Sequence, residues 1–80
     1  MNIKSVESAT LVAIGYDDAR EILQLEFRSR AVYRYFGVPG SVYEALAAAP
    51  SKGRYFNGAI RGHFRHALIS RTSSGQGGEA

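Results

Sequence analysis

The feature that most constrains the fold is the alternation in residues 21–28, EILQLEFR, where polar or charged side chains separate Leu23, Leu25 and Phe27. Successive side chains of a β-strand point to opposite faces of the sheet, so this pattern is typical of a strand with one buried face. β-Branched, aromatic and other apolar residues dominate residues 9–16, ATLVAIGY, and residues 32–36, VYRYF, which we interpret as two more strands. Short turns separate the three segments, so the sequence predicts a three-stranded antiparallel meander.

The pattern becomes helical after the third predicted strand. Ser41 and Glu44 have the spacing of a capping box, and residues 42–49 are mostly good helix formers. Pro50 would end this first helix.

A second helix is predicted over residues 52–68, KGRYFNGAIRGHFRHAL, with Ser51 as its cap. Its apolar stripe would consist of Phe56, Ile60, Phe64 and Ala67. Three glycines weaken it, and Gly62 is the place where it could break. Strands followed by helices predict an α+β fold with both helices packed on one sheet face.

The chain of 80 residues is long enough for one small domain. We expect residues 1–8 to be a flexible N-terminus, residues 9–69 to form the domain, and residues 70–80 to be a disordered Ser/Gly-rich tail. Without cysteine, neither a disulfide nor a thiolate metal site can hold the fold. No apolar run approaches the ~20 residues that span a bilayer, and residues 1–10 show no secretory signal. We therefore expect a soluble cytoplasmic protein with no membrane partner.

Charge divides the chain into two blocks. Residues 1–26 hold two cations and five acids, whereas residues 27–78 hold eight cations and a single acid, Glu44. Seven of those eight cations are arginine, whose planar guanidinium suits phosphate groups and stacks on bases. A one-sided positive block of this kind indicates a nucleic-acid partner; a merely solvated basic surface would give the same composition.

Tyr33 and Tyr35 lie two apart in the third predicted strand, so their rings share a face and Arg34 points the other way. A two-residue turn at Ser29 and Arg30 would place both tyrosines on the open face and Arg34 in the core. A three-residue loop over residues 29–31 would reverse the faces. The free-energy cost of burying an unpaired guanidinium favours the second register, with the tyrosines inward and Arg34 exposed.

The motifs IGYD, LEFRS, VYRYFGVP, VYEAL, APSKGRYFN and IRG occur in this order over roughly residues 5–68. In this order they resemble the KTSC domain, a short domain named for the C-terminus of some lysyl-tRNA synthetases that also occurs as a stand-alone bacterial protein. The family's Tyr-x-Tyr motif falls on Tyr33 and Tyr35. The resemblance implies no catalytic residue and no assigned role for these tyrosines; RNA binding has been suggested for the family, partly from the synthetase context.

Catalytic or metal chemistry has little support in the sequence. Asp17 and Asp18 lie in a predicted turn, where aspartate side chains bond nearby backbone amides. His63 and His66 would share a helix face, but a metal site needs a third ligand and no acid lies between Glu44 and Glu79. We expect no enzyme activity, no cofactor and no metal.

Nucleic-acid binding is the function that the sequence favours, with RNA or another single strand as partner. Arg54, Arg61 and Arg65 would recur along one face of the second helix and hold phosphates, assisted by Lys52. Arg34 or Tyr55 could contact a base. The alternative is a protein-interaction or homodimerisation module that uses an exposed sheet face or edge.

Overall fold

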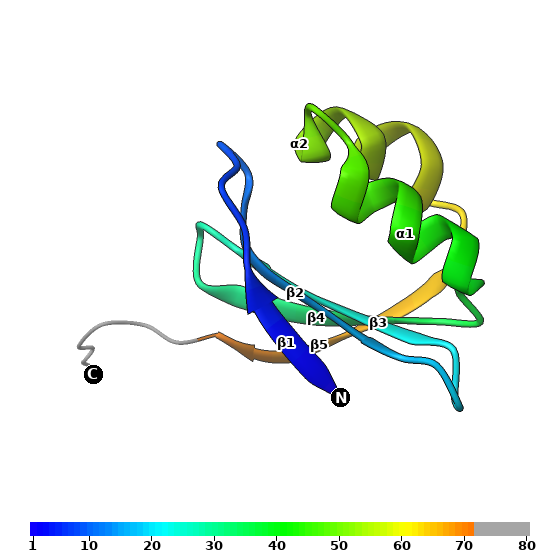
Figure 1. The fold of residues 1–80 in the computed structure, drawn as a ribbon. Helices are drawn as coiled ribbons and strands as arrows, with labels where there is room; N and C mark the ends of the chain where they lie inside the picture. Colours follow the sequence, from blue (N-terminus) through cyan, green and yellow to red (C-terminus); the bar gives the residue numbers. More distant parts are fainter. Residues whose placement is uncertain (72–80) are drawn as a thin grey trace.

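In a computed structural model that describes residues 1–71, the protein consists of one antiparallel sheet with its helical segments on one face (Figure 1). The five strands lie in the sheet in their order along the chain. Their bounds are β1 Asn2–Ser5, β2 Leu11–Asp17, β3 Ile22–Phe27, β4 Ala31–Phe36 and β5 Arg65–Arg71. The helical segments are α1 Gly40–Ala48, α2 Lys52–Tyr55 and the π-helix η1 Phe56–Ile60.

The α+β class and the three central strands are confirmed, but the predicted sheet is too small. The prediction lacks β1 and β5, which form the two edges of the observed sheet. β1 lies in residues 1–8, for which the sequence predicts no regular structure. The part of the predicted tail from position 72 onward lies outside the described residues. No helix in the described part of the chain is long and apolar enough to cross a membrane.

β1 approaches β2 closely at Gly15, which is paired with Ile3. A Cβ atom on Gly15 would lie 2.1 Å from Ile3 Cδ1 and 3.0 Å from the backbone oxygen of Asn2. The absence of a side chain at position 15 therefore makes room for Ile3 to lie on the sheet. This contact positions a strand whose four residues are otherwise exposed.

The hairpin between β3 and β4 confirms the inward direction of the two tyrosines. Tyr35 pairs with Leu23 and Tyr33 pairs with Leu25, so all four side chains share the face below the helices. The loop has three residues, as expected, but spans residues 28–30 instead of 29–31. Its last residue adopts the left-handed conformation (φ 74°) of a type I turn followed by a bulge.

The opposite face of the hairpin carries the arginine that separates the tyrosines. Arg34 pairs with Gln24, and its Nε atom donates to Gln24 Oε1 at 2.8 Å. A shift of the loop by one residue moves the strand pairing by two positions and leaves the faces unchanged. The predicted face is therefore correct although the predicted loop position is wrong.

The two predicted helix caps have different outcomes. Ser51 caps α2, because its Oγ atom accepts a hydrogen bond from the Arg54 amide at 3.3 Å. The capping box of α1 is not formed: Pro39 is the N-cap, and it makes no side-chain cap bond. Pro39 instead accepts the amide of Val42 through its backbone oxygen at 3.0 Å. Ser41 therefore lies inside the helix and not at its cap.

The predicted helix over residues 52–68 ends at Ile60. The Arg61 amide donates to the backbone oxygen of Phe56 at 2.8 Å, which closes the π-helical turn, and Gly62 then takes a positive φ of 79°. Residues from Arg65 onward turn back and pair with β4. Glycine adopts this conformation without the steric cost that a side chain would bring, so Gly62 terminates the helix.

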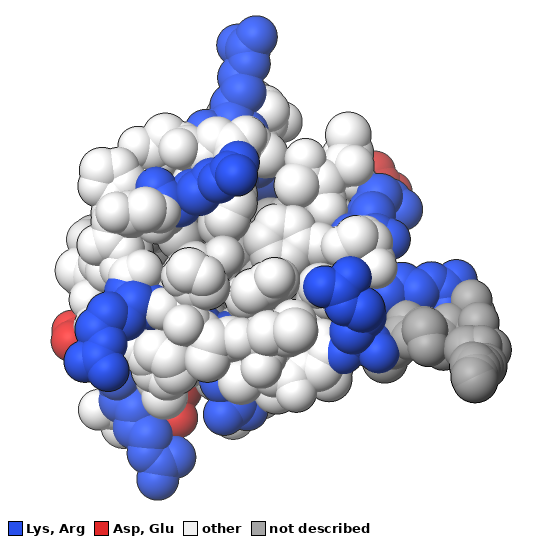
Figure 2. All heavy atoms as spheres, turned by 180° about the vertical axis from the view of Figure 1, so that it is seen from behind, with Lys and Arg blue, Asp and Glu red and all other residues white. Residues whose placement is uncertain are grey.

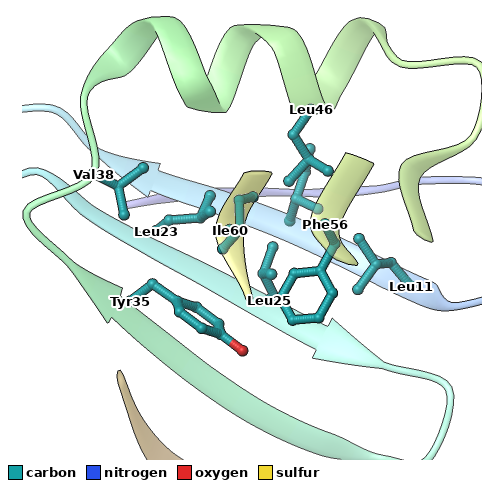
Figure 3. Packing of buried hydrophobic residues seen from close by; sticks show 9 residues of the cluster. Leu11, Leu23, Leu25, Tyr35, Val38, Leu46, Phe56 and Ile60 are labelled. Carbon is teal, nitrogen blue, oxygen red and sulfur yellow. The ribbon is translucent and has the colours of Figure 1, made fainter. Parts of the chain in front are cut away.

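The core lies between the sheet and the helical layer (Figure 3). The helices contribute Leu46, Phe56 and Ile60, which contact leucines of β3 and the ring of Tyr35. Each fully buried Leu or Ile stabilises the fold by roughly 1.5–3 kcal/mol. The fully buried members are Leu11, Ile14, Leu23, Leu25, Val38, Leu46 and Ile60.

Candidate nucleic-acid interface

An open cleft of about 390 Å³ lies beside the core, where β4 and β5 meet the end of η1. Its size is within the range of ligand pockets in proteins. Half of the residues that line it carry aromatic rings: Phe27, Tyr33, Tyr35, Phe56 and His66. We call it the aromatic cleft.

Strand register brings three of these rings together. Tyr35 pairs directly with His66 across β4 and β5, and their ring centroids are 5.4 Å apart at an interplanar angle of 28°. His66 also lies 5.7 Å from the ring of Tyr33, whose own distance to Tyr35 is 6.4 Å. The Tyr-x-Tyr spacing puts two rings on one face of β4, and the neighbouring strand adds the third.

The three rings differ in their exposure to solvent. Tyr35 is 5% exposed and is held edge-on by Phe56, so it belongs to the core. Tyr33 is half-buried and His66 is exposed. Two rings are therefore accessible to a ligand above a fixed floor.

Charge at the aromatic cleft is positive. Arg61 and Arg71 are exposed and line it, and none of the described acidic residues does. Among residues 1–71, a salt bridge joins Arg20 to Asp17. Neither Arg61 nor Arg71 forms a salt bridge with an acid in this part of the chain. Figure 2, the reverse of Figure 1, shows basic side chains distributed around a central uncharged area.

Burial raises the pKa of the Tyr35 hydroxyl above its ordinary value, and the neighbouring Tyr33 raises it further. The positive charge of Arg61 acts in the opposite direction. The hydroxyl is therefore neutral at physiological pH and can both donate and accept a hydrogen bond.

The three arginines predicted to share a helical face do not do so. Arg54 is exposed on α2, and Arg61 lies just after η1, where Nη1 donates to Asn57 Oδ1 at 3.5 Å. Arg65 begins β5 and pairs with Phe36, on the sheet face away from the helices. The single face is lost because the helix ends at Ile60, and Arg61 alone of the three lines the aromatic cleft.

The remaining predicted contacts are also dispersed. Lys52 is half-buried and its Nζ donates to the backbone oxygen of Ala49 at 3.1 Å. Tyr55 packs against the core and, with Arg54, lines a second, shallower hollow near Pro50. Arg34 lies across the sheet from the aromatic cleft, bonded to Gln24.

Sequence reasoning missed His66 and Arg71 as cleft residues, because it assigned the first to a helix and the second to a tail. The available signal was Gly62, a helix terminator followed by a segment long enough for one strand. The predicted His63–His66 pair does not share a helix face, since His63 lies in the turn before β5. Asp17 has the predicted turn role: its Oδ1 accepts the Arg20 amide at 3.2 Å.

Comparison with known proteins identifies the family. The model of the KTSC domain matches residues 7–64. The chain belongs to the KTSC domain family. A crystal structure of a KTSC domain protein from Yersinia pestis superposes with a TM-score of 0.84 at 36% identity, covering 86% of this chain and 97% of that one.

Two sequence relatives show different contexts for the KTSC domain. A protein of Tsukamurella paurometabola is 44% identical over 63 residues, which are 79% of this chain and 94% of the relative. A lysine–tRNA ligase of Nostoc sp. is 42% identical over 64 residues, which are 80% of this chain but 11% of the ligase. In this chain the Tyr-x-Tyr pair lies at the aromatic cleft, with the buried Tyr35 as its floor and the half-buried Tyr33 beside it.

Proposed function

We propose that this KTSC domain is a non-catalytic module that binds single-stranded nucleic acid, with RNA preferred, in the aromatic cleft. The observation that carries the proposal is the combination of accessible rings with two exposed arginines in one cleft, with no acid from residues 1–71 in its lining and no salt bridge from these arginines to such an acid. Stacking on aromatic rings and phosphate contacts from arginine are the two interactions by which proteins hold single strands. Arg61 keeps the phosphate-binding role that the sequence predicts, and Arg71, Tyr33 and His66 join it.

RNA is preferred over DNA because related segments occur in proteins named lysine–tRNA ligase. A domain carried by an enzyme that acts on tRNA is placed where an RNA contact is useful. The preference is testable by comparing a labelled RNA of about ten nucleotides with the DNA of the same sequence.

The test is a fluorescence anisotropy titration at about 50 and about 200 mM salt. The double variant Arg61→Gln/Arg71→Gln should bind weakly, with the log–log salt slope reduced by about 0.7 for each lost phosphate contact on a single strand. Arg54→Gln/Arg65→Gln is the matched control, because it removes the same charge from outside the aromatic cleft and should change affinity little. Equal losses in both variants, or no binding by the unmodified protein, would refute the proposed site.

A second candidate function, protein interaction, is favoured by the edge strand β5. Leu68 and Ile69 are 49% and 46% exposed there, and an edge strand offers unpaired backbone groups to a partner strand. This interaction would depend little on salt, and a sizing experiment would reveal a homodimer. The substitution Leu68→Lys should break such a dimer.

A further inference from the structure

We infer that the aromatic cleft holds a two-nucleotide segment of single strand along β4, with one flanking phosphate at Arg61 and the other at Arg71. This inference rests on the proposed function and adds to it the length and placement of the bound segment. It follows from where the sheet register places Arg71 and the accessible rings, and from where the turn after η1 places Arg61.

The arginines lie at opposite ends of the cleft. Arg71 pairs with Ala31, the first residue of β4. Arg61 begins the turn that leads from η1 to Arg65, and Arg65 pairs with Phe36, the last residue of β4. Ala31 and Tyr35 are four residues apart on one strand, which is ~13 Å at 3.3–3.4 Å per residue. The backbones of Arg71 and Arg61 therefore lie toward opposite ends of β4, with the inward-facing rings between them.

The accessible rings provide places for two bases. Tyr33 and His66 are neighbours across β4 and β5 and both open to the cleft, while Tyr35 beneath them is buried. Each base of a single strand can stack on one such ring, as on other sheet surfaces that bind RNA. Removing one stacking ring lowers affinity roughly 5- to 150-fold.

This arrangement selects a single strand over other anions. A duplex keeps its bases stacked on one another, so they cannot reach the rings. Inorganic phosphate or a mononucleotide can engage an arginine at one end only. An acidic peptide would satisfy the arginines but would leave Tyr33 and His66 without stacking partners.

The test pairs each arginine with one terminal phosphate. The ligands are a uridine dinucleotide with phosphates on both its 5′ and 3′ ends and the two forms that each lack one of them, titrated into the full chain by NMR. We expect Arg61→Gln to abolish the affinity gain from one terminal phosphate, and Arg71→Gln to abolish the gain from the other, as in a double-mutant cycle. Arg65→Gln should preserve both gains, and thermal unfolding of each variant confirms that it is folded.

A length series from one to about six uridines completes the test. Affinity should rise steeply up to two nucleotides with both flanking phosphates and then change little. If longer strands bind but affinity grows evenly with every added nucleotide, or each arginine variant loses both phosphate gains alike, the inference is wrong while the proposed function stands. If no strand of any length binds, the proposed function itself fails.

Discussion

The imidazole of His66 lies nearly parallel to the ring of Tyr35, with the two centroids 5.4 Å apart. One ring is exposed and belongs to an edge strand, and the other is buried in the core. Through this pair the core fixes the position of a side chain that a ligand can reach. A rigidly placed ring binds with a smaller entropy loss than a free one.

Replacing His66 by alanine should therefore weaken RNA binding roughly 5-fold or more without unfolding the domain. His66→Phe, which keeps a ring, should retain most of the affinity. The matched control is His63→Ala, because His63 is also exposed but lies in the turn outside the cleft. Anisotropy titrations decide the question, and an equal effect of both alanine variants would contradict the role of His66.

Tyr35 should matter to stability more than to binding. Tyr35→Ala removes a buried ring and should lower the free energy of unfolding by about 3–5 kcal/mol, as large aromatic-to-alanine changes do. Tyr35→Phe keeps the ring and should cost at most about 1–1.5 kcal/mol. Urea unfolding followed by circular dichroism measures both, and a loss below about 1 kcal/mol for Tyr35→Ala would show that the ring is not part of the core.

Alkaline pH should destabilise the fold. The pKa of Tyr35 is raised above its ordinary value of about 10 by burial and by Tyr33. A group with a raised pKa in the folded state contributes stability that is complete below the unfolded pKa. This contribution is lost as pH rises from about 10 through the folded pKa, because the unfolded chain releases its proton first.

Tyr16 adds to the same effect, since burial, followed by the negative charges of Glu21, Asp18 and Asp17, also raises its pKa. Urea unfolding between about pH 8 and about pH 11 should show a decline in the unfolding free energy. The decline should be shallower in Tyr35→Phe, which retains Tyr16. A variant with the same decline as the unmodified protein would rule out the contribution of Tyr35.

Two glycines, one within η1 and one just after it, should respond in opposite ways to substitution by alanine. Gly62 has a φ of 79°, so Gly62→Ala should lower stability by about 1–2 kcal/mol. Gly58 lies within η1, and a Cβ atom there meets no atom within 4 Å. Gly58→Ala should therefore raise stability by up to about 1 kcal/mol. Thermal unfolding distinguishes the two, and stabilisation by Gly62→Ala would contradict the positive φ.

The central fold was predictable because its signals are local. Alternation defines β3, and the cost of burying Arg34 gives the correct face for both tyrosines although the loop begins one residue earlier than expected. The edge strands have weaker signals. β1 has four exposed residues and depends on its contact with Gly15, which alternation along a single strand does not reveal.

β5 was missed because the helical spacing of the apolar residues continues past the end of the helix. Phe56, Ile60 and Phe64 have helical spacing, and this spacing outweighed Gly62, the local signal that a turn precedes Phe64. The pairing that makes residues 65–71 a strand is with β4, far away in sequence. The same error kept His66 and Arg71 out of the predicted site and put Arg65 on a helical face, whereas Arg61, also a predicted site residue, does line the aromatic cleft.

The most direct measurement of the central claim is an NMR titration of the isotope-labelled protein with a single-stranded RNA of about ten nucleotides. Binding in the aromatic cleft predicts that the amide signals of Tyr33, Tyr35, Gly62 and His66 shift and saturate together. Signals of β1 and of the outward-facing Gln24 should stay in place. Shifts confined to α2 or to the outer sheet face, or no shift at any RNA concentration, would contradict the account.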